Sequence, residues 1–166
     1  MFRRSRASRW LAALSLVAAT QAPAAETTTM PALIETLETW LDQTSPWPRR
    51  DALPHIRLLP PALAAGQYGS AGYMGGRLRA FYDDRTATIT LVAPWDMNDP
   101  ADQSVLLHEL AHHRQTAVHW YCPGAQELPA YKLQARWAKE NNAEVSINWI
   151  AATLEAGCTP RDIHPD

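Results

Sequence analysis

The stretch DPADQSVLLHELAHHRQTAV, residues 99–118, decides the fold of this chain. It begins with three features typical of a helix N-terminus: Asp99 as an acceptor at the cap, Pro100 at the first helical position and Asp102 in the first turn. Most of the following residues are apolar or small, which predicts a buried central helix over 99–118. Polar groups on such a helix need a partner or a metal ion, because their desolvation is otherwise costly.

The middle of this helix contains the motif His108-Glu109-Leu110-Ala111-His112. Residues four apart on a helix are separated by about 40° around the axis and by one turn along it, so both imidazoles can bind one tetrahedral ion. Glu109 lies about 100° from His108, which places its carboxylate beside the ion. We therefore expect a Zn²⁺ cofactor held by His108 and His112, with Glu109 as general base toward a water molecule.

A catalytic zinc site also needs a third protein ligand. The extended motif H-E-x-x-H-x-x-G-x-x-H would require glycine at 115 and histidine at 118, but the chain has Gln115 and Val118. The metzincin type of site is therefore excluded. His119 comes one residue late, and we expect it at the wall of the site or on the surface. His113 points about 100° away from His112 and should support a ligand or lie in the core.

The best candidate for the third ligand is Glu127. It follows a chain reversal at 121–124 and lies near the start of a helix expected over 128–141, which must fold back against the central helix. Glu140 and Glu144 are more distant alternatives. The helix dipole alone can favour a glutamate in a first turn, so a surface position for Glu127 stays open.

With an H-E-x-x-H helix followed by a glutamate on the next helix, the chain resembles the gluzincin type of zincin metallopeptidase over about residues 75–140. It is also similar to small secreted bacterial zincin-like domains of unassigned substrate, in which Cys-Pro-Gly and Glu-x-x-Ala-Tyr follow the motif, here at 122–124 and 127–131. The resemblance implies a zinc peptidase that acts on a peptide or protein, with Glu127 as third ligand. The chain departs from many gluzincins at Tyr131, where they have an acid.

Hydrolysis of an amide also needs a donor toward the developing oxyanion. Tyr131 is the favoured donor, because it lies one turn from Glu127 on the expected helix. Three other residues stay open for this role, namely Tyr73, His119 and Tyr121. The strand expected over 87–92 resembles the edge strand along which zincins align an extended peptide.

The elements that precede the central helix include a helix and a small sheet. Apolar residues spaced by three and four predict an amphipathic helix over 31–43. The segment 55–59 should be extended between prolines. A hairpin is expected from 77–82 and 87–92, with Leu78 and Ala80 matching Ile89 and Leu91 around the turn at 83–86.

The remaining segments complete an α+β domain. Five glycines make 66–76 a loop, either a lid over the site or a plain surface loop. Helices are expected over 128–141 and 143–156, the second ended by Gly157. The predicted fold is therefore a minimal zincin-like domain with an N-terminal helix, a small sheet with a hairpin, the buried H-E-x-x-H helix and two C-terminal helices.

Residues 1–25 have the features of a signal peptide. Four arginines precede an apolar run at 10–19, and Ala22-Pro23-Ala24 forms an A-x-A cleavage site. An apolar run of about ten residues is too short for a transmembrane helix, which needs about 20. We expect a periplasmic or secreted protein with one domain at 26–166 and no membrane association after cleavage.

Charge and cysteine content agree with export. Without the four arginines of the signal peptide, the chain keeps 11 of its 15 basic residues and has 17 acidic residues, which gives a formal net charge of −6. Nucleic acid is excluded as a partner, because phosphate binding needs a cluster of basic residues. Cys122 and Cys158 are the two cysteines, and in an oxidising compartment we expect them to pair.

These observations predict an exported zinc-dependent hydrolase, and the resemblance favours a peptidase. Two alternatives stay open. One is a binding or structural module in which the metal only stabilises the fold, and the other is a zinc hydrolase of a non-peptide bond such as a cell-wall amide.

Overall fold

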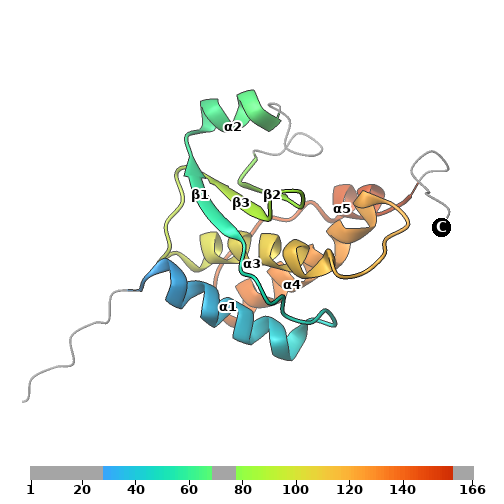
Figure 1. Ribbon diagram of the computed structural model, residues 1–166, viewed down its shortest axis with the longest axis horizontal. Helices are drawn as coiled ribbons and strands as arrows, with labels where there is room; N and C mark the ends of the chain where they lie inside the picture. Colours follow the sequence, from blue (N-terminus) through green and yellow to red (C-terminus); the bar gives the residue numbers. More distant parts are fainter. Residues whose placement is uncertain (1–27, 69–77, 159–166) are drawn as a thin grey trace, which may run out of the picture.

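The computed structural model describes residues 28–68 and 78–158 of the chain (Figure 1). Its elements confirm the α+β class. In chain order they are α1 (Met30–Thr44), β1 (His55–Leu59), α2 (Pro61–Tyr68), β2 (Ala80–Asp83), β3 (Thr88–Val92), α3 (Pro100–Gln115), the 3₁₀ helix η2 (Pro123–Gln126), α4 (Glu127–Glu140) and α5 (Trp149–Glu155). The predicted signal peptide, Tyr73, Arg77 and most of the Gly-rich segment lie outside the described residues.

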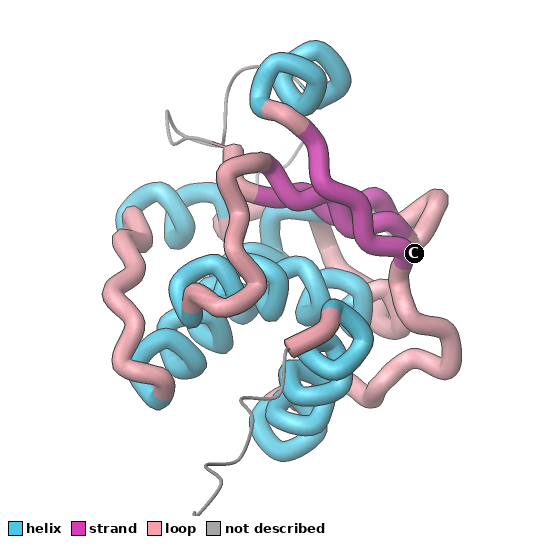
Figure 2. The backbone as a smooth tube through the Cα atoms, turned by 90° about the vertical axis from the view of Figure 1, so that its left-hand side faces the viewer, coloured by secondary structure: helices cyan, strands magenta, loops and turns pink. Residues whose placement is uncertain are grey.

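The strands form one mixed sheet in the order β1-β3-β2. The parallel pair β1 and β3 is in register from His55 opposite Thr88 to Leu59 opposite Val92. The antiparallel pair β2 and β3 is the predicted hairpin. Figure 2 shows the three strands next to one another, on one side of the packed helices, while α2 lies apart from those helices.

The hairpin differs in register from the prediction at one position. Ala80 lies opposite Leu91 as expected, but Ile89 faces Tyr82 and not Leu78, which precedes β2. With Ala80 opposite Leu91, antiparallel pairing places Tyr82 opposite Ile89, and the turn covers 84–87, where Ala87 has a positive φ of 49°. Both strands are shorter than predicted, because β2 begins at Ala80 and β3 begins at Thr88.

The expectation that 87–92 forms an edge strand is wrong. β3 pairs with β1 on one side and with β2 on the other, so it is the central strand. The edge strand next to the central helix is β2, which contacts α3. The sequence places β2 and β3 in one hairpin, but only the long-range pairing with β1 decides which of them lies inside the sheet.

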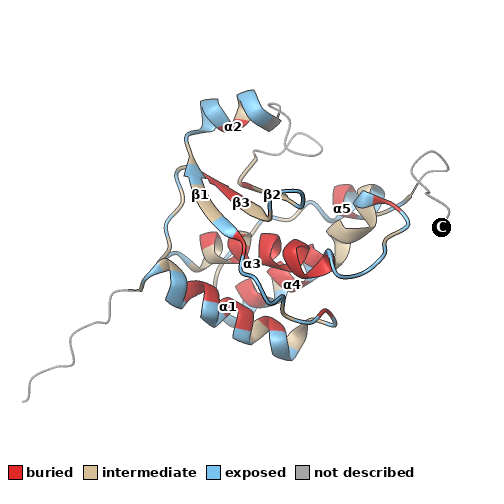
Figure 3. Ribbon diagram, viewed as in Figure 1, coloured by how far each residue is buried: buried red, intermediate tan, exposed pale blue. Residues whose placement is uncertain are grey.

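The helix α3 lies at the centre of the molecule, as its sequence predicts. Asp99 caps it by accepting a hydrogen bond from the Ala101 backbone N–H at 2.9 Å. The helix contacts β2, β3, α1 and α4, and it is buried along much of its length (Figure 3). Its C-terminal end comes at Gln115, not at 118 as predicted, because Ala117 and Val118 donate to carbonyls three residues back and close a tight turn.

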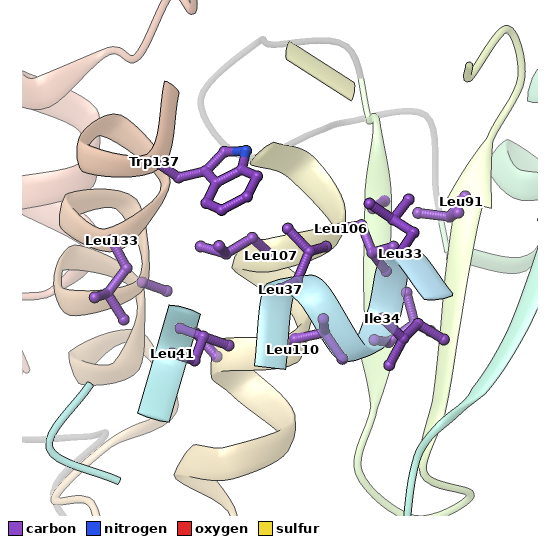
Figure 4. Close-up of a cluster of buried hydrophobic side chains, with 14 of the residues drawn as sticks. Leu33, Ile34, Leu37, Leu41, Leu91, Leu106, Leu107, Leu110, Leu133 and Trp137 are labelled. Carbon is purple, nitrogen blue, oxygen red and sulfur yellow. The ribbon is translucent and has the colours of Figure 1, made fainter. Parts of the chain in front are cut away.

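The main core lies where α1 packs on α3 and α4 (Figure 4). The spacing of three and four residues in α1 puts its apolar side chains on one face, which turns toward the central helix. Burying each of these side chains stabilises the fold by about 1.5–3 kcal/mol. The labelled residues in this cluster are Leu33, Ile34, Leu37 and Leu41 from α1, Leu106, Leu107 and Leu110 from α3, Leu133 and Trp137 from α4, and Leu91 from β3.

A buried cation also joins α1 to the end of α3. The Arg114 side chain is completely buried and donates from Nε to Glu38 Oε2 at 2.8 Å and from Nη2 to Asp42 Oδ1 at 2.7 Å. The same guanidinium donates to the backbone carbonyls of Glu38 at 2.8 Å and Trp47 at 3.1 Å. Because its hydrogen-bonding capacity is largely used, the charge is tolerated inside the core.

Two helices differ from the sequence prediction. Gly66 lies inside α2 and not in a loop, since Pro61 suits the first turn and the segment PALAAGQY contains good helix formers. α5 begins at Trp149 and not at 143, because Asn142 has a positive φ of 55° and the Asn148 side chain caps the helix by accepting from the Ala151 N–H. Residues 143–148 connect α4 to α5 without regular structure.

The helix α5 is anchored beside the start of α4. The predicted pairing of Cys122 with Cys158 is present, with an S–S distance of 2.00 Å. Gly124 allows close approach, because a Cβ at this position would overlap the backbone carbonyl of Glu155. The disulfide fits an oxidising compartment outside the cytosol. None of the helices within 28–68 and 78–158 has the length and hydrophobicity needed to cross a membrane.

Candidate metal centre

Three side chains with metal-binding atoms meet where α3 passes the start of α4. The Nε2 atoms of His108 and His112 are 3.0 Å apart. Glu127 Oε2 lies 3.4 Å from His108 Nε2, and Glu127 Oε1 lies 3.5 Å from His112 Nε2. The two histidines come from successive turns of α3, and Glu127 is the first residue of α4. The structure therefore brings together the three residues that the sequence suggests as ligands.

The separations within this group are suitable for a single tetrahedral ion. Zinc bonds of about 2.0–2.1 Å at tetrahedral angles place neighbouring ligand atoms about 3.3–3.4 Å apart. The observed separations of 3.0, 3.4 and 3.5 Å lie around this value. Two imidazole nitrogens and one carboxylate also form a common donor set for catalytic zinc, which leaves a fourth position open. The residues present therefore fit a zinc ion.

The charges of these side chains also favour a bound cation. Burial alone would raise the pKa of the Glu127 carboxyl, but the hydrogen bonds and charges of His108 and His112 outweigh it and hold this pKa well below its usual range. Burial would lower the pKa of His112, but Glu127 and Glu109 raise it. The carboxylates thus favour positive charge between the three side chains, which a divalent cation supplies.

Glu109 lies beside this group and is not part of it. Its exposed fraction is 7%, and burial raises the pKa of its carboxyl. The positive charges of His108 and His112 oppose this shift, the charge of Glu127 adds to it, and a backbone hydrogen bond from Tyr82 opposes it. A carboxyl whose pKa is raised is better suited to accept and return a proton.

Tyr131 packs against one of the candidate ligands. Its ring centroid is 4.4 Å from that of His108, with an angle of 55° between the ring planes. Burial and then the negative charge of Glu127 raise the pKa of Tyr131 to about 12. The hydroxyl therefore keeps its proton at neutral pH and can act as a hydrogen-bond donor.

A cleft of about 1210 Å³ opens onto these side chains. Its lining includes residues of β2, α3, α4 and α5. The candidate ligands, Glu109 and Tyr131 all line it. A structural zinc site is closed by four protein ligands, whereas this group is next to a space large enough for a substrate.

The other candidate site residues, two histidines and a tyrosine, have different surroundings. His119 lines the cleft, whereas Tyr121 is 68% exposed and stacks edge-on against His119 with 5.9 Å between ring centroids. His113 is engaged in the core: its Nδ1 lies 2.9 Å from the Tyr82 hydroxyl, and its Nε2 lies 2.8 Å from the Ala52 carbonyl oxygen. His113 thus connects α3 to β2 and to the segment before β1.

Neither of the alternative third ligands lies at the site. Glu140 is at the opposite end of α4, where it accepts from Trp40 Nε1 at 2.7 Å and from Arg136 Nε at 2.8 Å. Glu144 is exposed in the segment between α4 and α5. Glu127 is the glutamate that reaches the two histidines.

Sequence reasoning missed two residues of this region. In the sequence, Gln115 is notable only because it replaces a motif glycine. In the structure, its Oε1 lies 2.7 Å from His112 Nδ1. Its position three residues after a candidate ligand on the same helix is a signal that could have identified it. Glu155 lines the cleft from α5, and burial raises the pKa of its carboxyl. No local signal identifies Glu155, because the disulfide and Gly124 bring α5 to the cleft.

Comparison with known proteins places the chain in a family. The profile that matches residues 26–166 is described as "Domain of unknown function (DUF6647)". The chain belongs to this family. The DUF6647 match covers every described element, so the candidate metal centre lies within the family domain. No curated protein and no solved structure matches the chain.

Proposed function

We propose that this DUF6647 protein is an exported zinc-dependent hydrolase that cleaves peptide bonds. The observation that carries the proposal is the triangle of His108 Nε2, His112 Nε2 and Glu127 carboxylate oxygens, with separations of 3.0, 3.4 and 3.5 Å, at the wall of a large cleft. When bound, zinc would act as a Lewis acid that polarises a substrate carbonyl and lowers the pKa of a coordinated water.

The residues around the triangle have suitable positions for hydrolysis. Glu109 accepts a proton from the attacking water and transfers it to the leaving amine, a role that its buried carboxyl with a raised pKa supports. Tyr131 donates a hydrogen bond to the carbonyl oxygen as negative charge develops on it. The edge strand β2 borders the cleft, and an extended peptide alongside it would have backbone groups close to Glu109.

The open cleft distinguishes this proposal from a metal that only stabilises the fold. A structural site has no use for a carboxylate such as Glu109 placed next to the ligands and facing a cavity. A zinc hydrolase of a cell-wall amide would use the same side chains and differ in the substrate that the cleft accepts. We infer export to the periplasm or the medium from the signal peptide features of residues 1–25, and the Cys122–Cys158 disulfide agrees with this compartment.

Metal content and hydrolysis in the same preparations test the proposal. The protein is purified after export without chelators, its zinc is measured by inductively coupled plasma mass spectrometry, and a library of quenched fluorescent peptides is assayed. We expect about one zinc per chain in wild type, loss of zinc in Glu127→Ala, and retained zinc in Glu109→Gln with hydrolysis reduced by about 10²-fold or more.

Each result decides a separate part of the proposal. Wild-type protein without zinc would contradict the metal site itself. Glu127→Ala with full zinc content would contradict the third ligand. Zinc-loaded protein that cleaves cell-wall fragments but no peptide would support the alternative substrate, and activity unchanged in Glu109→Gln would contradict the general base.

A further inference from the structure

We infer that Gln115 positions His112 for metal binding and joins it to the segment that carries Glu127. The inference rests on the proposed zinc site and adds a positioning residue to it. Gln115 is the last residue of α3, is completely buried, and lies three residues after His112. Its side chain therefore projects from the same face of the helix as this candidate ligand.

The hydrogen bonds of Gln115 determine the orientation of its amide. Its Nε2 donates to the backbone carbonyl of Gln126 at 3.0 Å, and a carbonyl can only accept. The amide oxygen must therefore face the other way, toward His112 Nδ1 at 2.7 Å. An oxygen can only accept from this nitrogen, so Nδ1 of His112 carries a proton and Nε2 is the ring nitrogen available for the candidate metal position.

The second histidine has no equivalent support among the described residues. His108 Nδ1 is buried without a hydrogen-bond partner there, and its ring is held by packing against Tyr131. The orientation of His112 thus depends on one specific acceptor, whereas that of His108 depends on contact with a ring. Partners of this kind raise the basicity of a metal-binding histidine, and their loss typically costs 10–100-fold in metal affinity.

Gln115 also links the two helices that supply the ligands. Gln126, which accepts its amide proton, directly precedes Glu127 and ends the 3₁₀ helix η2. η2 follows Cys122, whose disulfide to Cys158 fixes this segment against α5. At the other end, the Gln115 carbonyl accepts from Trp120 Nε1 at 3.1 Å and stabilises the turn after α3. One buried side chain therefore sets the position of His112 relative to the start of α4.

The histidine tautomer in the wild-type protein gives the first test. Long-range ¹H–¹⁵N NMR spectra of the metal-free protein report which ring nitrogen carries the proton. We expect the Nδ1-protonated form for His112 in wild type and loss of this preference in Gln115→Met. A wild-type His112 whose Nδ1 carries no proton would overturn the inference whether or not the protein binds zinc.

Zinc affinity gives the second test, and it is measured by competition with a chromophoric chelator. We expect Gln115→Met to weaken zinc binding by about 10–100-fold. Gln115→Glu keeps an acceptor for the Nδ1 proton and should bind zinc more tightly than Gln115→Met. The matched control is Gln134→Met, which removes another buried glutamine. Gln134 lies on α4, and its Nε2 donates to Ser104 Oγ at 3.3 Å.

The control variant distinguishes the loss of His112 positioning from a general loss of protein stability. Thermal unfolding of the metal-free proteins shows how much each methionine variant destabilises the fold, and we expect weaker zinc binding in Gln115→Met alone. Wild type that binds zinc and a Gln115→Met variant of equal affinity would overturn the inference and leave the proposed function intact. Wild type that binds no zinc would contradict the proposed function. The tautomer test would still show whether His112 Nδ1 donates to Gln115.

Discussion

The candidate site depends on a few residues that share one helix but have different surroundings. His108 is held by the ring of Tyr131, His112 by the amide of Gln115, and Glu109 is buried beside both. These surroundings assign distinct properties to side chains that a motif alone does not distinguish. The ring of His112 is oriented by a residue of the same helix, whereas the ring that packs on His108 comes from α4.

The first prediction concerns the hydroxyl of Tyr131. Tyr131→Phe keeps the ring that packs on His108 and removes only the donor. We expect zinc content to be unchanged and kcat for peptide hydrolysis to fall by about 10²-fold, since removal of one donor to an oxyanion costs about 10²–10³ in kcat. KM should change little. Steady-state kinetics on a peptide found in the library assay provides the measurement.

Tyr121→Phe is the matched control for this prediction. Tyr121 is 68% exposed and packs against His119, so we expect wild-type kinetics. Wild-type activity of both Tyr131→Phe and Tyr121→Phe would exclude Tyr131 as the donor and leave His119, which also lines the cleft, and Tyr73 as candidates.

At the scale of elements, the buried cation of α3 decides how α1 is held. Arg114 donates to two carboxylates and two backbone carbonyls, all from α1 and the segment after it. Arg49 adds a second cation beside the same carboxylates, at 2.9 Å from Asp42 Oδ2 and 3.7 Å from Glu38 Oε2. The apolar contacts of α1 alone would hold the helix on the core but would leave the buried carboxylate of Glu38 without its hydrogen-bonded cation, with Arg49 Nε at 3.7 Å.

The second prediction is that Arg114→Met destabilises the protein by about 3–5 kcal/mol, because the buried carboxylate of Glu38 loses its hydrogen-bonded cation and keeps Arg49 Nε at 3.7 Å. Urea unfolding followed by tryptophan fluorescence measures the change. Arg136→Met serves as control, since Arg136 pairs with Glu140 on the surface with both side chains about half exposed. We expect this control to cost about 1 kcal/mol or less. Equal effects of the two substitutions would show that the buried pair contributes no more than a surface pair.

The third prediction uses two glycines in opposite environments. Gly124→Ala places a Cβ onto the carbonyl of Glu155, so α5 must move, and we expect a loss of about 1–3 kcal/mol. Gly66→Ala has open space around the new Cβ in α2 and should raise stability by about 0.5–1 kcal/mol. Urea unfolding of both variants tests the pair. A Gly124→Ala variant as stable as wild type would contradict the close packing of α5 on η2.

At the scale of the whole molecule, the C-terminal part of the chain completes the cleft. α5 contacts α4, and the disulfide joins residues separated by 36 positions in the sequence. The connection holds the last described helix against the segment that leads into Glu127. The stability of the cleft wall is therefore coupled to the redox state of one cysteine pair.

The fourth prediction is that Cys122→Ser/Cys158→Ser lowers the free energy of unfolding by about 2–5 kcal/mol, since a long loop is released in the unfolded state. Urea unfolding with and without reductant provides the measurement. Wild type should lose stability when reductant is added, and the double variant should not respond to it. Unfolding of wild type that is insensitive to complete reduction, verified by thiol titration, would contradict this role of the disulfide.

Much of the fold follows from local signals in the sequence. The cap at Asp99, the apolar spacing in α1 and the alternation around the hairpin each specify an element within a few residues of its observed position. Errors occur where backbone conformation at a single residue changes a boundary, as at Ala87 and Asn142 with positive φ. Side chains that reach over many residues, such as Arg114, leave no local signal.

The sequence by itself determined the motif helix, the two histidines one turn apart and the candidate glutamate on the next helix, because helical geometry and hydrophobic spacing act over a few residues. Only the tertiary structure decided that β2 is the edge strand, that Gln115 contacts His112, and that α5 with Glu155 forms a wall of the cleft. These features depend on which distant segments pack together. Strand pairing, a buried amide and a disulfide join residues that no local periodicity relates.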